Sequence, residues 1–263
     1  MSERTLEIDR TGAVGWVWMN RPAVHNALNE AMIEQLAEAF LNHGEDPDVR
    51  VIVLSGRGKS FSAGGDVEYM KRQGAAQRES NLANARALAE MFHVIAITPK
   101  PTIARVNGAA IGGGLGLIAA CDIAVASTTA KFAASEVRLG LIPSTIAPYV
   151  LRAIGPRHAR RLFQTGERID AAHAQQIGLV HETAEPEQLG ARIDALVKDL
   201  LAGAPTAQSA AKSLIEDVSG RPITRELMEE TAVRIAEIRS DPEAIEGLSA
   251  FLEKRSPDWM PEE

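Results

Sequence analysis

The stretch NGAAIGGGLG occupies residues 107–116, between the apolar segments 102–106 and 117–120. The β-branched residues of 102–106 predict a strand and the small residues of 114–120 predict a helix, so the glycines mark a strand-to-helix turn. A dinucleotide-binding turn has the spacing G-x-G-x-x-G, which requires a glycine at position 117 or 119. Leu117 and Ala119 occupy these positions. The spacing therefore excludes a dinucleotide fingerprint.

The glycine cluster has two other interpretations. One is close packing of a helix, because glycine carries no Cβ. The other is catalytic, because an uncovered N–H at the start of a helix suits a developing oxyanion. Residues 56–66, GRGKSFSAGGD, form a second turn of this kind, after the apolar strand 51–54 and before a helix. Two such turns would each offer one backbone donor, so the pair favours an oxyanion site.

Composition limits the class of protein. The 263 residues are 45% hydrophobic and 24% charged, which is typical of a soluble folded domain. The net charge of −7 disfavours a nucleic-acid groove. Cys121 has no partner for an intrachain disulfide and is expected to be a small buried apolar residue in a reducing, cytoplasmic compartment. We also expect no export signal, no membrane span and no metal site.

Strand and helix patterns alternate in the first half of the chain, which predicts an α/β fold. We expect a hairpin at 5–19, a helix capped by Asn29 at 30–40, strands at 51–54, 102–106 and 123–126, and helices at 82–97 and 114–120. After Pro148 the pattern is helical, at 150–164, 171–177, 188–201, 207–218, 225–238 and 242–251, with one short strand at 179–181. Each helix of this tail has one apolar face, so the tail is expected to dock on the core or on a neighbouring subunit.

A third motif precedes the two glycine turns: RP at 21–22, followed by NAL at 26–28. In order and spacing, these residues together with FSAGGD (61–66) and NGAAIGGG (107–114) resemble the crotonase (enoyl-CoA hydratase/isomerase) superfamily, over about residues 10–255. The resemblance implies a ClpP-like spiral of ββα turns in residues 1–200 and a C-terminal helical trimerisation region in residues 201–263. It also implies a homotrimer, or a hexamer built as a dimer of trimers.

The resemblance assigns roles to individual residues. The two oxyanion-hole amides of the family fall on Gly65 and Gly113, the same donors that the physical argument favours. Family hydratases use two glutamates; one position holds Glu136 and the other holds Gly116. A single carboxylate is therefore expected to move the proton. The remaining substrate contacts, the last two of which reach CoA across a subunit boundary, fall on Ala27, Ala63, Asp66, Phe251 and Lys254.

The activity that the resemblance implies is that of an enoyl-CoA hydratase, which adds water across the C2=C3 bond of an α,β-unsaturated acyl-CoA. No cofactor is implied, because coenzyme A is part of the substrate, and the partner is this acyl-CoA rather than a nucleic acid or a membrane. A Δ3,Δ2-enoyl-CoA isomerase, which also works with one carboxylate, and a non-catalytic acyl-CoA-binding protein are the alternatives.

One branch of the family is similar in its details. Gly116, the segment STIAP at 144–148 and the ending FLEKR at 251–255 resemble the hydratases of 3-methylglutaconyl-CoA and isohexenylglutaconyl-CoA. This resemblance implies a branched substrate and a place in leucine or isoprenoid catabolism. Such a substrate carries a second carboxylate, for which Arg72, Arg78 and Arg138 are the candidate partners.

Overall fold

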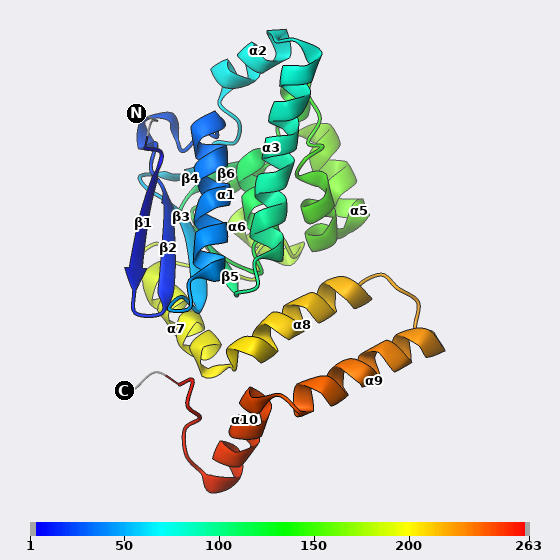
Figure 1. The fold of residues 1–263 in the computed structure, drawn as a ribbon. Coiled ribbons are helices and arrows are strands. Elements are labelled where there is room, and N and C mark those ends of the chain that lie inside the picture. The colour runs from blue at the N-terminus through cyan, green and yellow to red at the C-terminus, as the bar shows by residue number, and fades with distance from the viewer. Residues whose placement is uncertain (1–3, 261–263) are drawn as a thin grey trace.

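The computed structural model describes residues 4–260, which form two β-sheets covered by helices (Figure 1). The larger sheet is parallel apart from the hairpin β1–β2, and its order is β1 (Leu6–Thr11), β2 (Val14–Met19), β3 (Val51–Gly56), β5 (Thr102–Val106), β7 (Ile123–Ser127) and β10 (Glu182–Ala184). The smaller sheet has the order β4 (Ser60–Ser62), β6 (Ala109–Ile111), β8 (Lys131–Ala133) and β9 (Ile169–Asp170).

Successive turns of the chain repeat one unit. Each unit places a longer strand in the larger sheet and a short strand in the smaller sheet, and then continues into a helix. Thus α2 (Val67–Ala75) and α3 (Arg78–Ile97) follow β3 and β4; α4 (Gly113–Ala120) follows β5 and β6; and the 3-10 helix η2 (Glu136–Leu139) and α5 (Ala147–Thr165) follow β7 and β8. The predicted α/β spiral of ββα turns is confirmed.

In the central strand β3 the first four residues, 51–54, are all apolar. Ile52 and Leu54 pack into the main core, to which α1 (Glu30–Glu45) and α3 contribute. Val51 and Val53 pack on the opposite face, against α7 (Leu189–Ala202). Successive side chains of a strand point to opposite faces, and both faces are covered by helices, so these four positions are apolar. The next residue, Ser55, is buried as well, and its hydroxyl donates to the Arg105 carbonyl oxygen at 2.9 Å.

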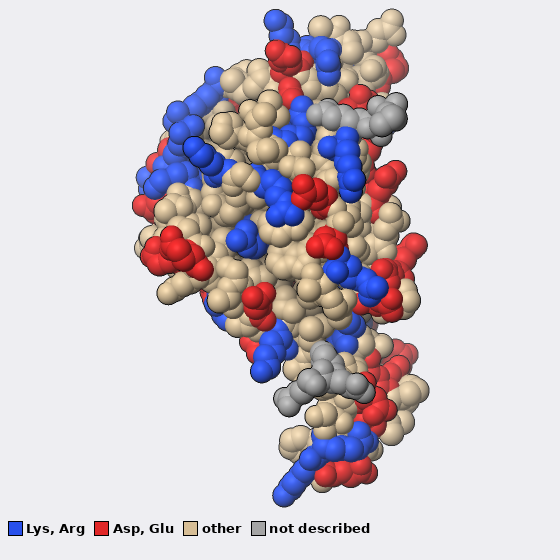
Figure 2. Space-filling view, turned by 90° about the vertical axis from the view of Figure 1, so that its left-hand side faces the viewer, with Lys and Arg blue, Asp and Glu red and all other residues tan. Residues whose placement is uncertain are grey.

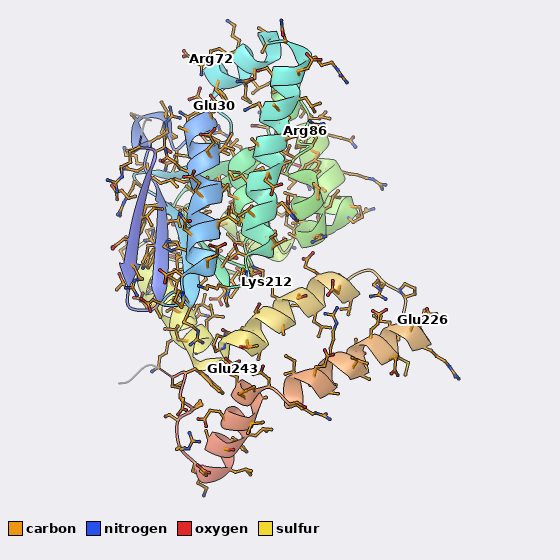
Figure 3. The ribbon with its side chains drawn as sticks, viewed as in Figure 1. Glu30, Arg72, Arg86, Lys212, Glu226 and Glu243 are labelled. Atoms are coloured by element: carbon orange, nitrogen blue, oxygen red, sulfur yellow. The ribbon has the colours of Figure 1, made fainter. Side chains whose placement is uncertain are left out.

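The C-terminal helices α8 (Pro205–Val218), α9 (Arg225–Arg239) and α10 (Pro242–Glu253) extend away from the body of the molecule (Figure 1). Polar contacts join them to it. The Arg50 guanidinium donates to the carbonyl oxygens of Gly203 at 2.6 Å and Trp259 at 3.2 Å. Lys212 of α8 reaches toward the body, where it pairs with Asp122 at 2.8 Å (Figure 3). The boundary drawn at residue 200 falls within α7.

The surface carries both signs of charge. On the face shown in Figure 2, lysine and arginine side chains are interspersed with aspartate and glutamate. Within residues 4–260 no helix combines the length and the apolarity needed to cross a membrane.

One predicted strand is wrong. Leu179 and Val180 lie buried in the turn after α6 (Ala171–Gln176), where both of their amides donate to the carbonyl oxygen of Ala174. The strand of this region, β10, begins at Glu182. The short strands β4, β6, β8 and β9 are not predicted by the sequence, because two or three residues are too few to show a period. Cys121 is buried as expected, and its burial raises the pKa of the thiol to about 12.

Asn26 ties the loop before α1 to the β3–β4 turn. Its side chain is completely buried, and its amide nitrogen faces the carbonyl oxygens of Arg57, Ser60 and Phe61 at 2.9–3.1 Å. Its side-chain oxygen accepts a hydrogen bond from the backbone N–H of Arg21. One side chain therefore satisfies the backbone of two segments that are far apart in the sequence.

We expect Asn26→Ala to lower the free energy of unfolding by about 3 kcal/mol or more, because it leaves several buried backbone groups without partners. Asn29→Ala is the matched control: Asn29 caps α1 by accepting from the Met32 amide, and its loss should cost only about 1 kcal/mol. Urea denaturation measures both values. Equal losses in the two variants would contradict the role assigned to Asn26.

Candidate active site

The structure brings the two glycine turns into direct contact. A Cβ built on Gly64, whose φ is +85°, would lie 2.5 Å from the carbonyl oxygen of Ile111. A Cβ built on Gly114 would lie 2.6 Å from the carbonyl oxygen of Ser62. Because any side chain at these two positions would push the turns apart, the contact requires glycine at both.

This contact sets the Gly65 and Gly113 amides next to each other. The Gly65 nitrogen lies 3.9 Å from the point where a Gly113 Cβ would stand. Among residues 4–260, neither amide donates to a protein acceptor. Gly113 is the first residue of α4, where helical N–H groups have no intrahelical partner and the helix dipole is positive. The two turns thus present a pair of free donors at one spot, as an oxyanion site requires.

Glu136 lies beside this pair. It opens η2, and its Oε1 is 3.1 Å from the point where a Gly112 Cβ would stand. Its Oε2 is buried without a hydrogen-bond partner among the described residues. Burial raises the pKa of the Glu136 carboxyl, and a hydrogen bond from its own backbone amide opposes the rise. A carboxylate held in this way takes up a proton more readily than an exposed one.

A cavity of about 520 Å³ joins these groups. Ala63, Gly65, Gly113 and Glu136 all line it. Its polar lining comes from Tyr69, Asn81, Asn84, Ser135, Ser144 and Thr145, and its larger apolar side chains are Leu28, Ile33, Val67, Met70, Leu88, Leu139, Leu141, Ile142 and Ile146. A pocket with mostly apolar walls and a few convergent polar groups is the usual form of a small-molecule site.

Ala27 and Asp66 do not line this cavity, and Arg21 joins them. The Arg21 guanidinium donates to the Ala27 carbonyl at 2.7 Å and to the Asp66 carboxylate at 3.2 Å. Asp66 also caps α2 by accepting from the Tyr69 amide. Burial alone would raise the pKa of Asp66, but the bonds from Tyr69 and Arg21 outweigh it and hold that pKa below its usual value. In this chain both residues hold the loop that carries Gly65.

Phe251 and Lys254 lie away from the cavity. They belong to the end of α10, at the opposite end of the molecule from α2 (Figure 1), and Phe251 is 81% exposed. A role at an active site would place them in that of a neighbouring subunit. The three candidate cations Arg72, Arg78 and Arg138 do not line the cavity either, and its lining, all within residues 4–260, includes no lysine or arginine.

The side chains packed around position 116 in this chain leave no room for a second glutamate. Gly116 lies inside α4, and a Cβ there would stand 2.3 Å from Cγ2 of Ile146 and 2.9 Å from Cε1 of Phe92. Ile146 and Phe92 are almost completely buried, so neither can move aside freely. Glu136 is accordingly the only carboxylate among the residues that line the cavity.

Several site residues escape sequence reasoning. Arg21 and Asn26 stand in the RP and NAL motifs, but only the fold shows that they fix the backbone around Gly65. Tyr69, Asn81 and Asn84 look like ordinary residues of amphipathic helices, and no sequence signal marks them.

Comparison with known proteins agrees with the geometry. The family described as enoyl-CoA hydratase/isomerase matches residues 9–262. The chain belongs to this family. The fold is that of a solved enoyl-CoA hydratase from Shewanella pealeana, with a TM-score of 0.94 and 39% identity over 97% of this chain and 96% of that one. An enoyl-CoA hydratase from Mycobacterium smegmatis gives a TM-score of 0.91 and 36% identity over 98% and 99% of the two chains.

A curated relative, the crotonyl-CoA hydratase of Syntrophomonas wolfei, is 31% identical over 99% of each chain. These matches run the full length of the proteins compared. They confirm the prediction of an enzyme of the enoyl-CoA hydratase/isomerase family.

We expect Gly116→Glu to lower the free energy of unfolding by more than about 3 kcal/mol, because it overpacks the core and buries a second carboxylate. The substitution should not increase activity. The variant Gly116→Ala overpacks the core without adding a charge, so it separates the two effects. The stability that Gly116→Ala loses should be smaller in the Ile146→Ala background, because Cγ2 of Ile146 is then absent. Urea denaturation of the four combinations measures this coupling. Additive losses would show that Ile146 does not occupy the space beside Gly116.

Proposed function

We propose that this protein hydrates the C2=C3 double bond of an α,β-unsaturated acyl-CoA, with the thioester oxygen bound by the amides of Gly65 and Gly113. The observation that carries the proposal is the cavity lined by these two free amides and by the half-buried Glu136, whose Oε2 has no partner among the described residues. The names of the full-length relatives support the same reaction class.

The two amides act on the charge that develops during the reaction. When an oxygen nucleophile adds to C3, negative charge moves through C2 to the thioester oxygen. Hydrogen bonds to that oxygen are stronger in the transition state than to the neutral carbonyl, so they lower the barrier rather than only tightening binding. Removal of one oxyanion-hole donor from an enzyme typically raises the barrier by about 3 to 4 kcal/mol.

Glu136 performs the proton transfer. Its carboxylate removes a proton from the attacking water while the water oxygen bonds to C3, and it then gives a proton to C2, so the carboxylate is regenerated. The raised pKa brings the group closer to the working pH, which favours transfer in both directions. In this mechanism the reaction needs no cofactor besides the CoA moiety of the substrate.

A Δ3,Δ2-enoyl-CoA isomerase is the second candidate. The specific observation in its favour is Ile146, which fills the space beside Gly116 and leaves one carboxylate in the cavity. One carboxylate suffices to move a proton between C2 and C4.

Incubation with crotonyl-CoA and with a 3-enoyl-CoA, followed by mass spectrometry and chromatography, separates the two candidates. Hydration adds the mass of one water to crotonyl-CoA. Isomerisation leaves the mass of the 3-enoyl-CoA unchanged and creates a conjugated thioester. An isomerised product without any hydrated product would overturn the hydratase proposal.

For the acyl group we propose a branched chain of the 3-methylglutaconyl type, on the likeness of Gly116 and residues 144–148 to that branch. The apolar walls of the cavity suit the methyl branch. The second carboxylate has no cationic partner among the lining residues of one chain. Rates with 3-methylglutaconyl-CoA, 3-methylcrotonyl-CoA and crotonyl-CoA separate the contribution of the branch from that of the carboxylate.

The assembly that we propose is a trimer, or a hexamer of two trimers, formed through α8–α10. The support is the exposed apolar side chains of these helices and of the loop between α8 and α9. Phe251, Leu252 and the loop residue Ile223 are 80–87% exposed, and Ile215, Met228 and Leu248 about 60%. Large exposed apolar patches of this kind mark interfaces. We place the enzyme in the cytoplasm, because its single cysteine suits a reducing compartment. We place it in leucine or isoprenoid breakdown on the branch resemblance alone.

Glu136→Gln should lower kcat by at least ~10²-fold and change KM little, because glutamine keeps the shape of the side chain but cannot accept a proton. The wild-type rate should fall as the pH drops through a pKa above 4.5, the usual glutamate value, since protonation removes the base. The variant should lack this acid limb. Steady-state kinetics across pH measure both effects, and a rate near that of the wild type would assign the proton transfer to another group.

The same substitution should leave stability equal or higher at pH 7. The raised pKa means that the folded protein favours the protonated form, so the ionised carboxylate destabilises it as the pH rises through that pKa. Glutamine avoids this cost, and its advantage should shrink toward acidic pH. Thermal melts of both proteins at pH 5 and pH 7 measure the difference. A less stable variant at pH 7 would mean that Glu136 is structural.

A further inference from the structure

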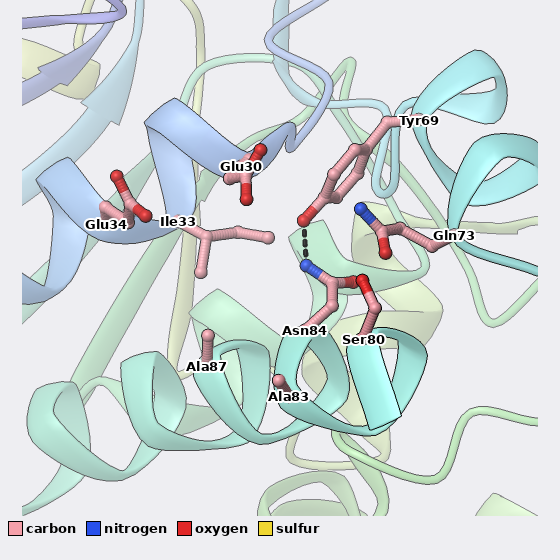
Figure 4. Close-up of a pocket in the computed structure, with 9 residues that line it drawn as sticks. All are labelled: Glu30, Ile33, Glu34, Tyr69, Gln73, Ser80, Ala83, Asn84 and Ala87. Carbon is pink, nitrogen blue, oxygen red and sulfur yellow. Dashed lines mark hydrogen bonds between the residues drawn. The ribbon is translucent and has the colours of Figure 1, made fainter. Parts of the chain in front are cut away.

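A second cavity adjoins the candidate active site. It measures about 260 Å³ and lies between the start of α1 and helices α2 and α3 (Figure 4). Three residues, Ile33, Tyr69 and Asn84, line both this cavity and the active-site cavity. These shared residues therefore stand between the two spaces.

Two of them are joined across the wall. The side-chain amide of Asn84 on α3 donates a hydrogen bond to the hydroxyl of Tyr69 on α2 (Figure 4). The Tyr69 side chain is buried, with 4% of the residue exposed. Burial, with Glu30 and Glu34 nearby, raises the pKa of Tyr69 to about 12, so its hydroxyl stays neutral at physiological pH. At this point the wall is held by one hydrogen bond between two neutral groups, so a substitution of either residue removes it without leaving a charge unpaired.

We propose that the Tyr69–Asn84 pair limits the length of the acyl chain, and that the second cavity is the extension that a longer chain would occupy. This inference rests on the proposed function, which fixes the thioester at Gly65 and Gly113. From that point the acyl chain runs along the cavity toward its far walls. At Tyr69 and Asn84 the wall separates it from further open space.

The lining of the second cavity defines the chain that fits. Ile33, Ala83 and Ala87 provide apolar surface for methylene groups, and Gln73 and Ser80 add neutral polar groups to the lining. Glu30 and Glu34 also line it, and Glu30 lies at the end of α1 that faces α2 (Figure 3). Carboxylates at this position repel a chain that ends in a carboxylate. The extension accordingly suits an uncharged aliphatic tail.

The test compares Asn84→Ala with Asn81→Ala. Both asparagines lie on α3 one turn apart, but Asn81 lines only the active-site cavity. With trans-2-enoyl-CoA substrates of four to twelve carbons, Asn84→Ala should raise the kcat/KM ratio of long to short chains by about tenfold, because each newly accommodated methylene is worth roughly fourfold. Asn81→Ala should change all chain lengths alike.

A filling variant checks that the gain comes from the second cavity. Ala87 lines that cavity alone, so Ala87→Leu in the Asn84→Ala background should return the length ratio to the wild-type value. Tyr69→Phe keeps the ring but loses the hydrogen bond, and should shift the ratio in the same direction as Asn84→Ala by a smaller factor. Circular dichroism shows whether Asn84→Ala folds. If it folds poorly, the chain-length ratio of Tyr69→Phe tests the proposal in its place.

Binding of saturated butyryl-CoA and decanoyl-CoA by calorimetry gives a readout that needs no turnover. If the wild type hydrates no enoyl-CoA, the proposed function fails, while the binding ratio still reports on the wall. If Asn84→Ala and Tyr69→Phe leave the decanoyl-to-butyryl binding ratio at the value of Asn81→Ala, the role of the Tyr69–Asn84 pair is overturned. A raised ratio that Ala87→Leu abolishes supports it.

Discussion

The contact between the turn at 62–65 and the turn at 111–114 is the constraint on which the site depends. The backbones meet so closely that a Cβ at Gly64 or Gly114 would overlap a carbonyl oxygen of the facing turn. Leu28 pairs with this contact from the other side: its amide donates to the Gly64 carbonyl at 2.7 Å, and its carbonyl accepts from the Asp66 amide at 2.9 Å. Three segments far apart in the sequence are thereby fixed around one pair of free N–H groups.

Much of the surrounding structure supports this backbone rather than the substrate. The side-chain amide of Asn26 donates to carbonyl oxygens of the β3–β4 segment. The Arg21 guanidinium links the Ala27 carbonyl to the Asp66 carboxylate. An oxyanion site made of backbone amides cannot adjust by side-chain rotation, so its geometry has to be set by such contacts in advance. Arg21 and Asn26 thus help to set the geometry of the proposed site although neither of them lines the cavity.

The single carboxylate is also a consequence of packing. Ile146 occupies the space that a side chain at 116 would need, and it lines the cavity at the same time. The gain is a cavity with one buried acid, whose desolvation is not compounded by a second negative charge nearby. In the proposed mechanism Glu136 therefore carries every proton transfer.

The sequence by itself determined the α/β class, the long helices and the glycine turns, because these depend on local periodicity and on turn residues. The spiral of ββα turns followed only from the resemblance to the crotonase superfamily. The sequence also pointed to Glu136 and to the amides of Gly65 and Gly113. The strand predicted at 179–181 was wrong, because Leu179 and Val180 are apolar residues that pack in the core from a turn. Pairing with β7 decided that residues 182–184 form β10 instead.

Only the tertiary structure decided how the cavity is bounded. The partners of Gly116, the wall formed by Tyr69 and Asn84 and the absence of a cation from the lining arise from contacts between α2, α3 and the loop before α5. Asn81 and Asn84 are residues of the same type on the same helix, yet Asn81 borders only the active-site cavity and Asn84 borders both cavities. No local pattern distinguishes them, because their difference lies in what packs opposite to them.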